Sequence, residues 1–191
     1  ELREQTPSDR VLKLAPVNYR PDSPCSGFMS FLNDIFKGDK DLIAFIQRAI
    51  GYALTGKTNE QVFFFAYGTG ANGKSTLFET ILSILGDYGK ASEFDTFLAN
   101  DKGNIRNLEG VARLQGTRYA LASETDSTRR FSEALVKKIT GGDTLTGAKL
   151  YGKAFAFKPE FKLWLLANHL PPAKDGSYGF WRRVKVIPFN R

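Results

Sequence analysis

Four residues between positions 68 and 75 have the types and spacing of a phosphate-binding loop. Gly68, Gly73, Lys74 and Ser75 fit the pattern G-x-x-x-x-G-K-[S/T]. Glycines let backbone N–H groups point at phosphate oxygens, the lysine reaches the β- and γ-phosphates, and the hydroxyl can ligate Mg²⁺. The sequence therefore predicts a site for ATP and Mg²⁺, with Lys74 on a solvated loop; a glycine-rich turn without ligand is the alternative. The predicted binding residues are Gly68, Thr69, Gly70, Ala71, Asn72, Gly73, Lys74, Ser75 and Thr76.

Two further polar residues directly follow apolar, strand-like runs. Glu124 follows residues 117–123 and Asn168 follows residues 161–167. Ligands of parallel α/β sheets bind beyond the carboxyl ends of the strands, so we expect both residues beside the loop. Glu124 would hold Mg²⁺ or polarise the attacking water, with Asp126 as a second metal candidate or a helix cap. Asn168 would sense the γ-phosphate; an ordinary strand-end glutamate and a turn-forming asparagine are the alternatives.

The elements that must position these residues alternate between strand and helix. A short apolar run at 61–67 predicts a strand entering the loop, and apolar residues at helical spacing predict a helix from 76 to 85 that ends at Gly86. The alternation predicts a three-layer α/β fold with a parallel sheet. Further strands are expected within 90–98 and at 117–123, 161–167 and 183–189, a hairpin at 144–157, and helices near 108–114 and at 128–140.

The N-terminal part predicts an arm and a small helical module ahead of this core. Residues 1–24 contain four prolines and read as a linker or extended arm. Two helices are expected within residues 25–58, and the ATPase core within 59–191. In the first helix we expect Phe28 and Met29 in the core.

Composition and charge limit the class of protein. The single cysteine, Cys25, forms no internal disulfide, fits a reducing compartment and is expected to be buried. The sequence has no apolar run of membrane-spanning length. Residues 118–191 hold 14 Lys and Arg against 6 Asp and Glu, whereas residues 1–117 hold 13 against 14. This excess predicts a polyanionic partner, with a solvated basic surface as the alternative. It comprises Arg129, Arg130, Lys137, Lys138, Lys149, Lys153, Lys158, Lys162, Arg182, Arg183 and Lys185 among others.

Several motifs in this order resemble superfamily 3 helicases, in particular the phage/plasmid and poxvirus primase-helicase branch. The resemblance covers about residues 40–191 and rests on Gly51-Tyr-Ala-Leu-Thr-Gly56, Gly70-Ala-Asn-Gly-Lys-Ser-Thr76, Ser123-Glu124, Trp164-Leu-Leu-Ala-Asn168 and Phe180-Trp-Arg-Arg-Val-Lys-Val-Ile-Pro-Phe189. It implies a P-loop NTPase core of AAA+ type and a hexameric ring with ATP sites between subunits. It also implies translocation on single-stranded or forked DNA in replication.

The resemblance also implies roles for particular residues. Lys74, Ser75, Glu124 and Asn168 match the catalytic loop, the acidic motif and the sensor, although many relatives have two adjacent acids where this chain has Glu124-Thr125. Arg183 matches the arginine finger, with Arg182 as the neighbouring alternative. Lys149, and less closely Lys153, match the pore hairpin that touches DNA.

The leading hypothesis from the sequence is a DNA helicase motor that is a fragment of a larger primase-helicase. We expect it in the cytoplasm, that of the host if the chain is encoded by a phage or plasmid, with no membrane association. Two alternatives remain open at this point. One is a P-loop ATPase without unwinding activity, such as a packaging motor or a loader. The other is a nucleic-acid binding module that ATP switches.

Overall fold

The fold is an α/β sandwich built on one parallel sheet. The computed structural model describes residues 3, 6–99, 105–124, 131–169 and 178–190, and for residues 105–107 the backbone alone. The helices are α1 (Ser26–Ile35), α2 (Lys40–Ala53), α3 (Lys74–Leu85), α4 (Ile105–Ala112), α5 (Glu133–Gly141) and α6 (Tyr178–Trp181). The strands are β1 (Phe63–Tyr67), β2 (Gly89–Ala91), β3 (Tyr119–Ser123), β4 (Leu145–Ala148), β5 (Ala154–Phe157), β6 (Lys162–Ala167) and β7 (Val184–Pro188). Short 3₁₀ turns lie at Pro7–Asp9, Gly86–Tyr88 and Phe94–Phe97.

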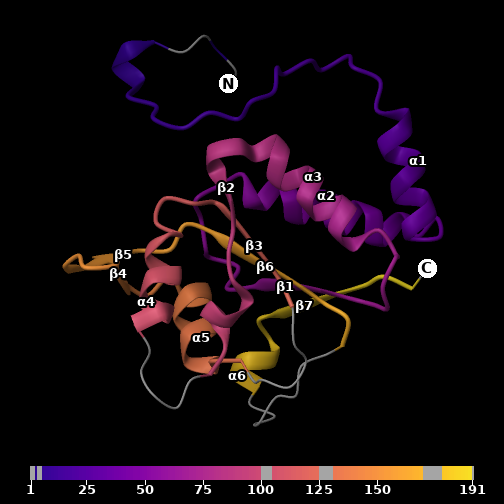
Figure 1. Ribbon diagram of the computed structural model, residues 1–191. Coiled ribbons are helices and arrows are strands. Elements are labelled where there is room, and N and C mark those ends of the chain that lie inside the picture. Colours follow the sequence, from indigo (N-terminus) through magenta and orange to yellow (C-terminus); the bar gives the residue numbers. More distant parts are fainter. Residues whose placement is uncertain (1–2, 4–5, 100–104, 125–130, 170–177, 191) are drawn as a thin grey trace.

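Five of the strands form the central sheet, in the order β2-β3-β6-β1-β7. All four neighbouring pairs are parallel, as the alternation of strands and helices predicted. β6 therefore lies between β1 and β3, although it comes after both in the chain (Figure 1). This insertion decides which strand ends become neighbours at the carboxyl edge of the sheet.

Alternate residues of the strands face two different apolar layers, because successive side chains of a strand point to opposite faces. One face presents Phe64, Trp164 and Leu121 to α1, α2 and α3. The other presents Phe65, Leu163 and Ala122 to α5, α6 and the Phe94–Phe97 turn. Figure 1 shows α2 and α3 on one side of the sheet and α4, α5 and α6 on the other. The three-layer arrangement predicted from the sequence is present.

The helical segment before β1 packs into the same core as the sheet. Leu32, Ile35 and Phe36 are buried in one cluster with Phe64 and Trp164. The prediction for the start of α1 was wrong, because Phe28 and Met29 are 38% and 41% exposed. Cys25 is also exposed rather than buried.

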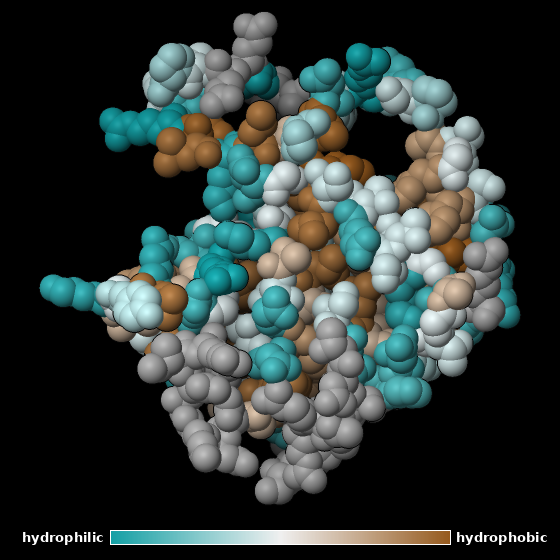
Figure 2. Space-filling view, viewed as in Figure 1, coloured by the Kyte–Doolittle hydropathy of each residue, from teal (hydrophilic) through white to brown (hydrophobic). Residues whose placement is uncertain are grey.

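The N-terminal arm is extended and touches the body at one corner. Leu14 N–H donates to Asp87 Oδ2 at 3.0 Å, and Asp87 N–H donates to Leu14 O at 3.1 Å. Gly86 ends α3 with φ +50°, and a Cβ there would lie 2.4 Å from Pro16 Cδ. In Figure 2 the arm crosses the top of the molecule as a separate ridge. A few local contacts, rather than a buried face, hold the arm in place.

Two element boundaries differ from the predictions for a physical reason. The strand expected within 90–98 is limited to its start, because β2 covers only Gly89–Ala91. Phe94–Phe97 is a 3₁₀ turn whose two phenylalanines are buried. Helix α3 begins at Lys74 rather than at residue 76, because Gly73 at φ +88° turns the chain into the helix. In addition, the helix expected at 128–140 begins only at Glu133: Phe131 pairs with Leu98 in an isolated bridge, and the Ser132 side chain caps the helix by accepting from Leu135 N–H.

Candidate nucleotide site and hairpin

The glycine loop, residues 68–73, joins the end of β1 to the start of α3. Its geometry needs glycine at two positions. A Cβ on Gly68 (φ +153°) would lie 2.2 Å from Phe189 O, and one on Gly73 (φ +88°) would lie 2.6 Å from Ile35 Cγ2. The glycines therefore allow close approach of β7 on one side and of α1 on the other. The first turn of α3 then lies at the carboxyl edge of the sheet, where a helix N-terminus favours anions.

Lys74 is buried, not on a solvated loop as the sequence suggested; its exposed fraction is 7%. The Lys74 ammonium donates to Gly68 O at 2.5 Å and to Asn72 Oδ1 at 3.1 Å. Burial lowers the pKa of Lys74 from its usual value. An ammonium has three protons, so within the described structure one remains for an oxygen of a ligand.

Glu124 and Asn168 follow the two strands next in order to β1. The register pairs Tyr67 with Ala167, so the glycine loop and Asn168 continue from neighbouring strands. Glu124 N–H donates to Leu166 O at 2.7 Å, which fixes the backbone of Glu124 against β6. At about 4.8 Å between strands, the glycine loop and Glu124 lie roughly 10 Å apart across the sheet, with Asn168 between them. Asp126, the second acid considered, lies outside the described residues.

Ser75 is exposed and lies in the first turn of α3, at the same edge of the sheet. Within the described part of the chain, no three His, Cys, Asp or Glu side chains gather into a metal site. Ser75 and Glu124 fit Mg²⁺ only as partial ligands, with phosphate oxygens and water completing the shell. The donor set therefore suits a metal that arrives with a nucleotide.

Arg182 and Arg183 lie at the opposite edge of the sheet. Phe63 N–H donates to Arg183 O at 2.9 Å, at the amino end of β1. A five-residue strand of about 3.3 Å per residue puts Arg183 roughly 17 Å along the strand from the glycine loop of its own chain. The Arg183 side chain does not reach that loop.

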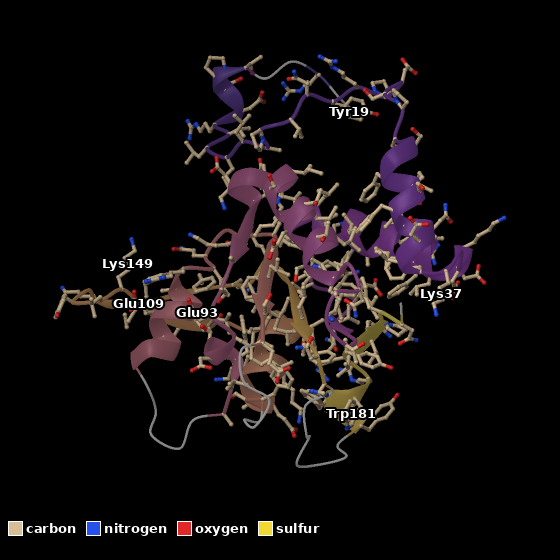
Figure 3. All side chains as sticks on the ribbon, turned by 45° about the vertical axis from the view of Figure 1, so that its right-hand side comes forward. Tyr19, Lys37, Glu93, Glu109, Lys149 and Trp181 are labelled. Atoms are coloured by element: carbon tan, nitrogen blue, oxygen red, sulfur yellow. The ribbon has the colours of Figure 1, made fainter. Side chains whose placement is uncertain are left out.

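The two arginines differ in their surroundings. Arg182 is exposed and donates to Gln61 Oε1 at 2.5 Å. Arg183 is half-buried and donates through Nη1 to Gly179 O, while its Nε is buried without a hydrogen-bond partner in the described structure. Burial and the neighbouring Arg182 lower the pKa of Arg183, and Asp143 opposes them. Figure 3 shows Trp181, the preceding residue, at the outer surface of α6.

β4 and β5 form the antiparallel hairpin that the sequence predicted, apart from the central sheet. Its base is fixed, because Leu145 is buried and a Cβ on Gly147 would lie 2.7 Å from Ala112 Cα of α4. Its turn projects at one side of the molecule, where Figure 3 places Lys149. Lys149 and Lys153 are both exposed at this turn.

The sequence analysis missed an aromatic residue at the same turn. Tyr151 is 100% exposed at φ +58°, and Leu150 beside it is 60% exposed. Gly152 N–H donates to Lys149 O at 2.8 Å and closes the turn. An aromatic between two lysines was visible in the sequence, but only the backbone shows that it points away from the body.

One lysine of the basic segment does not contribute to a surface. Lys162 in β6 is 1% exposed, and its ammonium donates to the carbonyls of Thr55, Lys57 and Glu160, the last two at 3.1 and 3.2 Å. Burial, with Arg118 nearby, lowers the pKa of Lys162 to about 8. Of the other basic residues, Arg129 and Arg130 lie outside the described residues.

The family described as "Family of unknown function (DUF5906)" matches residues 66–183, from the end of β1 to Arg183. The chain belongs to this family. Relatives of this DUF5906 chain include "Putative helicase L207/L206" of Acanthamoeba polyphaga mimivirus, 34% identical over 98% of the chain and 20% of the relative. "Putative helicase 022R" of Frog virus 3 is 31% identical over 87% of the chain and 18% of the relative. "Putative primase C962R" of African swine fever virus is 22% identical over 94% and 19%.

Solved structures share the fold of this DUF5906 chain. The apo A form of the NrS-1 C-terminal region has a TM-score of 0.66 at 16% identity, over 93% of the chain and 39% of that structure. The chain thus spans about a fifth of the length of these curated relatives and about two fifths of this structure. Relatives named as helicases and primases of large DNA viruses fit the primase-helicase branch that the motifs resemble. No helix in the described ranges is long and apolar enough to cross a membrane.

Proposed function

We propose that this chain is the ATP-hydrolysing motor of a DNA helicase that acts in replication. The observation that carries the proposal is the split of the predicted residues between the two edges of one sheet. The glycine loop, Asn168 and Glu124 lie at the carboxyl edge, and Arg183 lies at the amino edge. A site that needs all four residues is complete only where two copies of the chain meet.

The described contacts support a division of work within such a site. Backbone N–H groups of the glycine loop and the third N–H of the Lys74 ammonium would donate to the phosphates, and Ser75 would ligate Mg²⁺. The metal would neutralise charge on the phosphate oxygens. Glu124 would orient the attacking water, Asn168 would hold the γ-phosphate and that water, and a neighbour's Arg183 would offset charge on the transferred group.

The order of strands supports a core of the P-loop, AAA+ type. β6 is inserted between the strand that precedes the glycine loop and the strand that precedes Glu124. In the proposed site, Asn168 would then lie between the phosphates and the acid. A heterologous interface of this kind generates a ring where its rotation closes, and we propose a closed hexamer.

The hairpin supports the nucleic-acid part of the proposal. Exposed Lys149 and Lys153 fit phosphate groups, and exposed Tyr151 between them offers a face on which an unpaired base stacks. We propose that single-stranded or forked DNA passes these turns in the ring. Relatives about five times longer, one of them named a primase, support a primase domain in the same polypeptide. We also propose that the protein acts in the cytoplasm.

The deciding experiment measures strand displacement on a forked DNA duplex together with ATPase activity. Light scattering with nucleotide and DNA first tests whether the chain assembles to the mass of a hexamer. We expect ATP hydrolysis stimulated by single-stranded DNA and ATP-dependent displacement. Stimulated hydrolysis without displacement would favour a packaging motor or loader, and ATP-dependent DNA binding without hydrolysis would favour a switched binding module.

A further inference from the structure

We propose that Asn72 is a positioning residue for Lys74: its amide holds the lysine ammonium with one end and ties the glycine loop to the end of β7 with the other. The inference deepens the proposed function, on which it rests for the role of Lys74. The contacts themselves are properties of the fold.

Asn72 is almost completely buried, with an exposed fraction of 3%. Its Nδ2 donates to Phe189 O at 3.0 Å, across 117 positions of the chain. Its Oδ1 accepts from Lys74 Nζ at 3.1 Å and, weakly, from Lys74 N at 3.4 Å. A buried amide whose two ends have different partners is fixed in one orientation, because a flip would place donor against donor.

The acceptor of the tie is itself fixed. Phe189 N–H donates to Tyr67 O at 2.8 Å, so the residue after β7 is bonded to the last residue of β1. The Phe189 ring packs against Phe36 and Phe78, with ring centroids 5.0 and 5.8 Å apart. The loop is thus held by a rigid neighbour, and the Asn72 amide connects that neighbour to the Lys74 ammonium, which also donates to Gly68 O.

The amide suits this position better than shorter or charged side chains. Alanine has neither end of the contact. Aspartate keeps an oxygen for Lys74 but has no N–H for Phe189 O, and its charge raises the pKa of an adjacent ammonium. The two substitutions therefore break the tie to β7 equally and act in opposite directions on Lys74.

Pulse labelling of lysines with acetic anhydride, read by mass spectrometry, tests the inference without any enzymatic assay. The unprotonated amine reacts, so the rate for Lys74 reports its access and its pKa. Lys37, which projects into solvent in Figure 3, gives the reference rate. Asn59→Ala, at an exposed asparagine whose side chain donates to Glu60 Oε1 at 3.3 Å, is the matched control.

In Asn72→Ala we expect Lys74 to react roughly tenfold faster relative to Lys37. The variant loses both the charge-assisted hydrogen bond to the Lys74 ammonium and the side chain that shields it from the reagent. In Asn72→Asp the rate stays at or below that of the unchanged chain. Faster labelling in both variants means that Asn72 only packs the loop, and an unchanged rate in Asn72→Ala means that it does not hold Lys74; either result overturns the inference. If Asn72→Ala fails to fold, Asn72→Asp decides alone: faster labelling of Lys74 in that folded variant overturns the inference.

Adding Mg·ATP to the unchanged chain separates this inference from the proposed function. Protection of Lys74 by Mg·ATP supports nucleotide binding at the loop. Absence of protection contradicts the proposed function, while the labelling of the two variants still decides the role of Asn72.

Discussion

The glycine loop and the hairpin turn are both short turns that present lysine, yet the structure holds them in opposite ways. Lys74 is 7% exposed and has two protein acceptors, and the glycines of its loop pack against α1 and the end of β7. Lys149 and Lys153 are exposed, and their turn meets the body only at the base of the hairpin. A pre-organised group affects a reaction through its fixed geometry. Exposed charges affect binding mainly through how many phosphate contacts they make, and that contribution depends on the salt concentration. The difference predicts that changes in the loop abolish ATP hydrolysis itself, whereas changes in the hairpin leave basal hydrolysis intact and act on its coupling to DNA.

The largest effect is expected at Lys74. Lys74→Ala should abolish ATP hydrolysis, because no other described side chain replaces its ammonium among the loop carbonyls. Steady-state ATPase assays check this, with Lys40→Ala, at an exposed lysine, as the control. Turnover near that of the unchanged chain would show that the loop is not the nucleotide site.

Arg183→Ala should lower ATP hydrolysis by about 10³–10⁵-fold while leaving the glycine loop of its own chain intact. Mixing Arg183→Ala with Lys74→Ala subunits should recover part of the activity, because some interfaces then join an intact loop to an intact arginine. Hydrolysis at the unchanged rate in Arg183→Ala alone would contradict the assignment. Arg182→Ala in parallel decides which arginine acts, and the bond of Arg182 to Gln61 favours a smaller loss there.

Glu124→Gln should still bind ATP and Mg²⁺ but hydrolyse ATP about 10²–10⁴-fold more slowly, because the amide keeps the shape and loses the charge that orients water. Nucleotide binding measured by calorimetry and hydrolysis measured by phosphate release separate the two effects. Glu60→Gln, at an exposed glutamate, serves as the control. Normal hydrolysis would move the role to another acid such as Asp126.

The smallest effect on basal ATP hydrolysis is expected at the hairpin. Lys149→Ala should keep basal ATP hydrolysis and lose DNA stimulation and unwinding. Its affinity for single-stranded DNA should show a salt slope lower by about 0.7, as for one phosphate contact. Titrations at several salt concentrations measure this, with exposed Lys90→Ala as the control. Unwinding at the normal rate would make the turn an ordinary surface loop.

The same contrast explains which features were predictable from the sequence. β1, β3 and β6 are buried apolar runs, and polar residues after parallel strands must meet at one edge, so the placement of Glu124 and Asn168 followed from local pattern. Lys162 interrupts such a run, and its apolar neighbours were the available signal that it is buried.

The burial of Lys74 and the pairing of Asn72 with Phe189 depend on contacts between segments far apart in the chain. No local spacing encodes such contacts. Phe28 and Met29 were misplaced for a related reason. The apolar residues of α1 exceed what one helix face can bury against the sheet.

Strand β7 begins one residue after Arg183 and ends one residue before Phe189, so its two ends belong to different environments. Phe189 O accepts from the amide of Asn72 beside Lys74, and Arg183 lies at the other end of the strand. In the ring that we propose, one short strand would therefore be shared by two consecutive nucleotides, its own and its neighbour's. A tilt of this strand after one nucleotide is hydrolysed would move Arg183, which the neighbouring site requires. The order in which the subunits hydrolyse ATP would then depend on the movement of one stiff strand. Each site would act on the next without any flexible linker.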